Sequence, residues 1–334
     1  MLLMALVFVV LQRCASIFQE QHAAAKHRAH EEQCPTFLPH RETPSGVQSL
    51  PWRDQSEPSG KATAQRLYLS LLKTVLTGGV NEDFAEPYRN ANTGQRENAG
   101  CDIKSDASCS MTWDGWARLT ALEPVVEGLL RDEVAGDFAE VGVLKGAVTM
   151  FLQGMLLVHR GVARDLWVVD SFEGMGSREQ LEADAQAVDH PIRSQLTGKV
   201  TWEIKRWTNE LRVSKGDATA VQDRFLRHGL LRPNVKILPG RVTHLFTQSC
   251  APIRQLAFLR IDVDVYAATL HTLVQLYPKL APGGVVLFDD DKLFYARKAM
   301  MDFRATHNVS EPIQNLSGTL DRMVYWTKSK GSIE

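Results

Sequence analysis

Residues 137–147 read DFAEVGVLKGA, and this stretch decides the fold class. A short apolar run ends at Gly142, and a helical pattern rich in Leu and Met follows over 148–158. Glycine permits a tight turn and lets a ligand approach the backbone closely, although an ordinary helix start needs a turn as well. The spacing is neither the Gly-x-Gly-x-x-Gly pattern nor a P-loop, so it does not favour a dinucleotide pyrophosphate or a nucleoside triphosphate.

Outward from this unit, apolar runs alternate with helical patterns. We expect strands over 138–141, 166–170, 235–238, 256–262 and 285–288, and helices over 66–77, 119–130, 148–158, 221–228, 267–280 and 294–307. Near-continuous apolar strands separated by helices predict an α/β fold whose parallel sheet is covered on both faces. The stretches 312–316 and 322–327 predict a terminal antiparallel pair.

Polar residues and a glycine follow the expected strands at their carboxyl ends, where open α/β sheets bind ligands. They are Gly142, Asp170, Asp262 and Asp289. An acid after the second strand commonly accepts hydrogen bonds from a ribose diol, which favours a nucleoside ligand at Asp170. The alternative is that Asp170 or Ser171 caps a following helix.

A cluster of acids is the strongest chemical signal. Asp262 and Asp264 close one strand, and Asp289 and Asp290 close the next. Four bare carboxylates at neighbouring strand ends would repel one another, and a divalent cation with oxygen ligands removes that repulsion. Strand alternation would aim Asp262 and Asp264 the same way, so that one binds metal and the other acts as a base. The alternative is a set of solvated turn acids, with Arg260 as an ion-pair partner.

Composition excludes several classes of protein. The 334 residues are 44% hydrophobic and 23% charged, which is not collagen-like, disulfide-dense or disordered overall. A net charge of −1 gives no general attraction to nucleic acid. Five cysteines are too few and too irregular for a disulfide framework or a zinc site, although Cys101 and Cys109 suit a bridge if the chain is secreted.

The first sixty residues differ from the rest. Leu2 to Leu11 is an apolar run of ten residues, too short to span a membrane but suited to the apolar core of a signal peptide. Arg13 follows this run instead of preceding it, so an uncleaved stub or a mis-assigned start remains the alternative. We expect a signal-like segment at 1–16, a disordered linker at 17–61 and a catalytic domain at 62–330. The protein would enter the secretory pathway or an organelle if the run is a signal, and stay cytoplasmic otherwise.

The motifs together resemble the macrocin O-methyltransferase family, whose members methylate sugar hydroxyls in antibiotic biosynthesis with S-adenosylmethionine. The matching stretches are TWDGWARL at 112–119, DFAEVGV at 137–143, WVVDSFEG at 167–174, LRIDVDVY at 259–266 and LYPKLAPGG at 276–284. The resemblance implies a Rossmann-like class I methyltransferase fold. Such a fold has a mostly parallel seven-stranded sheet with an antiparallel last strand and helices on both faces.

The resemblance also implies a site. S-adenosylmethionine would be held by Thr112, Glu140, Gly142, Asp170 and Ser171, with Asp170 on its ribose. Magnesium (Mg²⁺) would be bound by Asp262, Asp289 and Asp290, with Asp264 as the catalytic base. The implied reaction is Mg²⁺-dependent methylation of a hydroxyl on a sugar, a glycoside or another small molecule with a vicinal diol. That acceptor is the expected partner, with no nucleic acid and no firm membrane span, and a homo-oligomer remains open.

Some residues depart from the family pattern, and two other functions stay open. Arg241-Val242 stands where the family has Trp-Phe, Asp291 where it has Tyr, and Val263 where it has Gly. Residues 176–212 cannot be aligned, so the family's antibiotic-sugar substrate is not carried over. A metal-dependent glycosyltransferase would share the Asp-x-Asp motif and the N-terminal apolar segment. A non-catalytic binding protein on the same fold is the third reading.

Overall fold

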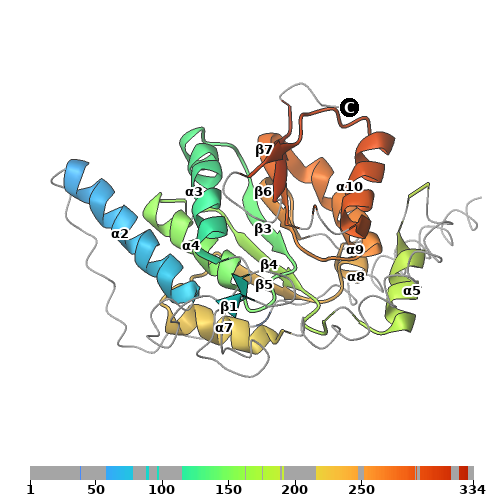
Figure 1. Ribbon diagram of the computed structural model, residues 1–334, viewed down its shortest axis with the longest axis horizontal. Coiled ribbons are helices and arrows are strands. Elements are labelled where there is room, and N and C mark those ends of the chain that lie inside the picture. The colour runs from blue at the N-terminus through green and yellow to red at the C-terminus, as the bar shows by residue number, and fades with distance from the viewer. Residues whose placement is uncertain are drawn as a thin grey trace, which may run out of the picture.

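The computed structural model describes residues 38, 58–77, 88–89, 96–97, 115–161, 163–174, 176–188, 190–191, 216–246, 252–289, 291, 294–316 and 323–329. In this part of the chain, a central sheet lies between two groups of helices (Figure 1). Thr112, Asp290, the apolar run at 2–11 and all five cysteines lie outside the described residues. No described helix is both long enough and apolar enough to cross a membrane.

The central sheet has seven strands in the order β5-β4-β3-β6-β7-β9-β8. Their bounds are β3 Asp137–Val141, β4 Leu166–Asp170, β5 Val235–Pro239, β6 Leu256–Ile261, β7 Leu280–Phe288, β8 Gln314–Asn315 and β9 Val324–Thr327. Strands β3 to β7 are mutually parallel, and β9 is antiparallel to both β7 and β8. All six residues of β6 are buried, as expected for a strand covered on both faces. The predicted fold class is therefore confirmed.

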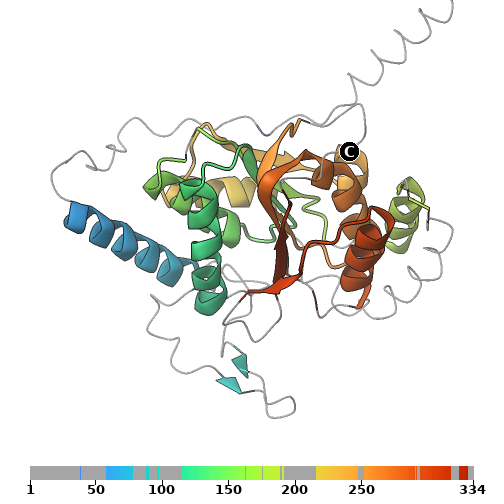
Figure 2. The ribbon, with the colours of Figure 1, turned by 90° about the horizontal axis from the view of Figure 1, so that it is seen from above.

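Each face of the sheet has its own apolar core and its own helices, which separate clearly when the molecule is seen from above (Figure 2). One face carries α2 (Pro58–Leu76), α3 (Gly115–Arg131), α4 (Ala147–Val158) and α7 (Ala218–Arg227). The other face carries α5 (Arg178–Ala187), α8 (Val242–Leu245), α9 (Tyr266–Leu276) and α10 (Phe294–Thr306). This double cover leaves the carboxyl ends of the parallel strands as the edge where a ligand can enter.

Two expected elements differ in the structure. Helix α9 ends at Leu276 instead of 280, because Pro278 forces a 3₁₀ turn, η2 (Tyr277–Lys279). Strand β7 then begins at Leu280 and includes the Pro-Gly-Gly expected to lie before it. The pairing of β6 with β7 shifts register there, and this irregularity absorbs the extra residues.

Two further elements were not expected at all. Helix α5 lies in the stretch that could not be aligned. Strands β1 (Tyr88–Arg89) and β2 (Arg96–Glu97) form a small antiparallel pair inside a stretch expected to be an irregular loop.

Candidate active site

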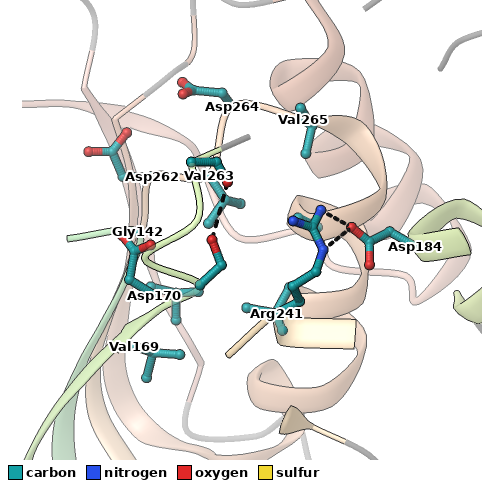
Figure 3. Close-up of a pocket in the computed structure, with 14 residues that line it drawn as sticks. Gly142, Val169, Asp170, Asp184, Arg241, Asp262, Val263, Asp264 and Val265 are labelled. Atoms are coloured by element: carbon teal, nitrogen blue, oxygen red, sulfur yellow. Dashed lines mark hydrogen bonds and ion pairs between the residues drawn. The ribbon is translucent and has the colours of Figure 1, made fainter. Parts of the chain in front are cut away.

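An open pocket lies at the carboxyl ends of β3, β4 and β6, as the edge of a parallel sheet predicts (Figure 3). It encloses about 580 Å³, counting space open to solvent, within the range of small-molecule sites. Its walls include Gly142, Asp170, Ser171, Arg241, Asp262 and Asp264. The structure therefore brings most of the sequence-predicted residues together around one cavity.

The turn after β3 requires glycine for a measurable reason. Gly142 has φ 89°, and a Cβ placed on it would lie 1.8 Å from the carbonyl oxygen of Asp262. Its N–H donates to the carbonyl of Val169 at 2.8 Å, and the N–H of Asp262 donates to the carbonyl of Val141 at 2.8 Å. The ends of β4, β3 and β6 are thus joined by main-chain hydrogen bonds at the floor of the pocket.

Asp170 holds the two loops on either side of it. Its carboxylate accepts backbone N–H bonds from Val143 at 2.8 Å, Leu144 at 3.2 Å and Phe172 at 2.8 Å. Burial raises the pKa of the Asp170 carboxyl, and these backbone N–H groups act in the opposite direction. Leu144 and Phe172 have φ of 50° and 57°, so both loops carry backbone strain beside the pocket.

The alternative role for Asp170 and Ser171 as helix caps is wrong. The next helix, α5, is capped by Ser177, whose Oγ accepts from the N–H of Gln180 at 3.3 Å. Ser171 instead closes its own turn, because its Oγ donates to the carbonyl of Gly174 at 3.2 Å. Both Asp170 and Ser171 line the pocket, which is where a ribose-binding pair is expected.

The acids after β6 and β7 are held by two arginines, not solvated. Arg260, 1% exposed, donates to Glu140, lies 2.9 Å from Asp262 and lies 3.1 Å from Asp289. Arg118 of α3 reaches Asp289 at 3.0 Å. The expected role of Arg260 as an ion-pair partner is confirmed. Arg118 could not be predicted, because it lies 171 residues from Asp289 in the chain.

Asp264 occupies a strained turn. Its φ is 60°, and the N–H of Val265 donates to the carbonyl of Val263 at 2.6 Å, which closes a three-residue γ-turn. The strand ends at Ile261, so strand alternation cannot orient Asp262 and Asp264, and that part of the prediction is wrong. The turn nevertheless places both on the pocket wall, opposite Arg241 (Figure 3). Strain of this kind often marks a functional side chain.

Two predicted or neighbouring residues lie off the pocket wall. Glu140 is 1% exposed and binds Arg260 beneath the floor, so it is not placed where a ligand could touch it. Asp291, 5% exposed, pairs with Arg297 of α10.

The residues present fit magnesium in kind and in charge. Asp262 and Asp289 follow residues that pair across neighbouring strands, Ile261 and Phe288, and they offer the oxygen ligands that Mg²⁺ prefers. Four carboxylates, those of Glu140, Asp262, Asp264 and Asp289, face two guanidinium groups, which leaves two negative charges. Among the described residues no three acidic, His or Cys side chains are close enough to form a metal site. Two of the three expected ligands are described, and the third is Asp290.

The opposite wall of the pocket carries an ion pair that the sequence did not reveal. Arg241, at the end of β5, donates through Nε to Asp184 of α5 at 2.9 Å and through Nη2 to the same oxygen. The Oγ1 of Thr243 donates to the other oxygen of Asp184. The departure from the family pattern at Arg241 was visible in the sequence, but its partner lies in the stretch that could not be aligned.

Comparison with known proteins identifies a common family pattern. The family model described as macrocin-O-methyltransferase (TylF) matches residues 70–328. A tetracenomycin-C 4'-O-methyltransferase from Streptomyces olivaceus, whose printed substrate carries a dimethoxy-rhamnosyl group, is 34% identical over 80% of this chain and 95% of its own. The mycinamicin III 3''-O-methyltransferase from Micromonospora griseorubida is 33% identical over 80% of this chain and 98% of its own.

A solved structure gives the same result. The O-methyltransferase NovP superposes with a TM-score of 0.61 and 29% identity, over 80% of this chain and all of its own. This overlap includes the whole seven-stranded sheet described above, so the similarity extends to the edge that carries the pocket.

Proposed function

Because this chain belongs to the macrocin O-methyltransferase family, and is thus an S-adenosylmethionine-dependent O-methyltransferase, we propose that it methylates a hydroxyl group of a sugar or glycoside. Membership confirms the resemblance drawn from the motifs and disfavours the glycosyltransferase alternative. The observation that carries the proposal is a single pocket lined by both Asp170, the acid suited to a ribose, and Asp264, an acid in a strained turn.

The residues of the pocket divide the work. Gly142 leaves the floor bare, so a cofactor can lie against the backbone, and Asp170 with Ser171 is suited to its ribose hydroxyls. When bound, S-adenosylmethionine supplies an electrophilic methyl group on a sulfonium. Asp264 accepts the proton of the acceptor hydroxyl on its carboxylate as the oxygen attacks. The rigid pocket floor contributes alignment of the two reacting groups.

Magnesium is part of the proposal. Asp262, Asp289 and Asp290 would hold the ion, which when bound supplies a Lewis acid that lowers the pKa of a coordinated hydroxyl. Support comes from the oxygen donors at neighbouring strand ends and from the two negative charges left after Arg260 and Arg118 are counted. Glu140 acts indirectly in this scheme, by holding Arg260 in place.

The test is a methyl-transfer screen with labelled S-adenosylmethionine. Free sugars, glycosides and catechols serve as acceptors, each with magnesium chloride and with a chelator. We expect methylated products from at least one sugar or glycoside, and loss of most activity with the chelator. Methylation of catechols but of no sugar would overturn the proposed acceptor class, and full activity with the chelator would overturn the metal.

A further inference from the structure

The order of the strands sets the direction in which the cofactor must lie. Along the pocket edge, Arg241 follows β5, Asp170 follows β4, Gly142 follows β3, and Asp262 with Asp264 follows β6. In the proposed function, the reacting methyl group lies near Asp264 and the ribose lies on Asp170. The nucleoside base then continues in the same direction and reaches the end of β5.

We propose that Arg241 is the binding platform for the adenine base of the cofactor, and that Asp184 is the positioning residue that holds it. This inference rests on the proposed function for the orientation of the cofactor. It assigns a ligand-binding role to a side chain and to a helix, α5, that the motifs do not include.

The geometry shows a side chain fixed for such a role. The Arg241 side chain is 12% exposed, and that of its partner Asp184 is 3% exposed. Two nitrogens of the guanidinium bind one oxygen of Asp184, and Thr243 binds the other, so the buried carboxylate is fully used. A buried charge pair with this many hydrogen bonds has one orientation, and the plane of the guanidinium is set by it.

The loop before α5 packs against the same guanidinium. Gly176 has φ 90°, and a Cβ placed on it would lie 2.6 Å from Nη1 of Arg241. Figure 3 shows Arg241 extending from its strand end toward Asp184, with Asp170 and Val169 across the pocket. Both Arg241 and Asp184 line the pocket. The guanidinium therefore has α5 on one side and the ligand space on the other.

The chemistry of arginine suits a purine. The guanidinium is planar and delocalised, and it stacks on aromatic faces in a way that a lysine ammonium cannot. A competing explanation is that the ion pair only ties α5 to α8. The two explanations differ for Arg241→Lys, which keeps a cation beside Asp184 but removes the flat surface.

The experiment is calorimetric binding of S-adenosylhomocysteine to the full chain and to three variants, with thermal unfolding of each. We expect Arg241→Lys to raise Kd by about fivefold to thirtyfold while Tm falls by no more than about 2 °C. Asp184→Asn should also raise Kd, because it releases the guanidinium. The matched control is Arg304→Lys, at an arginine that lies 4.5 Å from the ring of Trp326 and outside the pocket lining. Its Tm should fall, but its Kd should stay within twofold.

Three outcomes overturn the proposal. One is an Arg241→Lys chain that binds within twofold of the unaltered chain, and another is an equal loss of binding in Arg304→Lys. The third is an unaltered chain that does not bind S-adenosylhomocysteine at all, which would also remove the proposed function. If binding behaves as expected but no sugar is methylated, only the proposed acceptor class fails.

Discussion

The two halves of the pocket edge are held in place by different means. In the cofactor half, at the ends of β3, β4 and β5, main-chain groups do most of the fixing, since Asp170 accepts three backbone N–H bonds. In the acid half, at the ends of β6 and β7, Arg260 and Arg118 balance the carboxylates. The cofactor half should therefore respond to changes in hydrogen-bonding shape, and the acid half to changes in charge.

The largest effect is expected from Arg260→Met in the acid half. This change leaves Glu140, Asp262 and Asp289 without their shared cation, and breaking a buried charge network costs about 3–5 kcal/mol. Urea unfolding followed by circular dichroism measures the loss. Magnesium chloride should raise the unfolding midpoint of this variant more than that of the unaltered chain, because the ion binds the folded state. A loss below about 1 kcal/mol would show that charge does not hold this half together.

Asp264→Asn should reduce turnover about 10²-fold to 10⁴-fold, because the amide cannot accept the proton. Asparagine tolerates positive φ as aspartate does, so the γ-turn and the affinity for S-adenosylhomocysteine should be unchanged. Asp264→Ala is the matched control for strain, and it should lose about 1–2 kcal/mol of stability in addition. Near-normal turnover of the Asn variant removes Asp264 from the base role.

Asp170→Asn tests the cofactor half. The amide NH₂ replaces one acceptor oxygen and faces a backbone N–H, and such an unmet donor costs about 1–3 kcal/mol. We expect about tenfold weaker binding of S-adenosylhomocysteine by calorimetry. Asp165→Asn, just before the other end of β4, is the control and should bind normally. Equal binding by both variants would mean that Asp170 neither touches the cofactor nor shapes its loops.

The smallest effect is expected from Ser177→Ala. Ser177 and Gln180 form a reciprocal capping box at the start of α5, and loss of such a cap costs about 1 kcal/mol. Thermal unfolding should detect this loss. Binding of S-adenosylhomocysteine should weaken by no more than about threefold, because Asp184 lies two turns further along the helix. A larger loss of binding would place the control of the pocket wall in the cap itself.

The sequence predicted the sheet well because its strands are buried on both faces and read as uninterrupted apolar runs. It predicted the cofactor half from local motifs, since Gly142 and Asp170 each directly follow a strand. Helix α5 was missed because its sequence is mostly polar, although Ser177 and Gln180 carried a capping signal.

The acid half was only partly predictable. Which side chains neutralise the acids depends on contacts between distant segments, and nothing near Asp289 in the sequence indicates Arg118. The turn at Asp264 was also missed, because the alternation of a strand was extended past the residue where β6 ends. Long-range charge pairing and strained turns are decided by the folded chain, not by local pattern.

The close approach of Gly142 to the carbonyl of Asp262 has a consequence for how this enzyme can be altered. That contact joins the cofactor half to the acid half through main-chain atoms alone, so the spacing between methyl donor and base is independent of the surrounding side chains. A library of substitutions should therefore tolerate almost nothing at Gly142, yet accept wide variation along the exposed face of α5. Acceptor preference can then be redesigned on the walls while the reacting distance stays built into the floor.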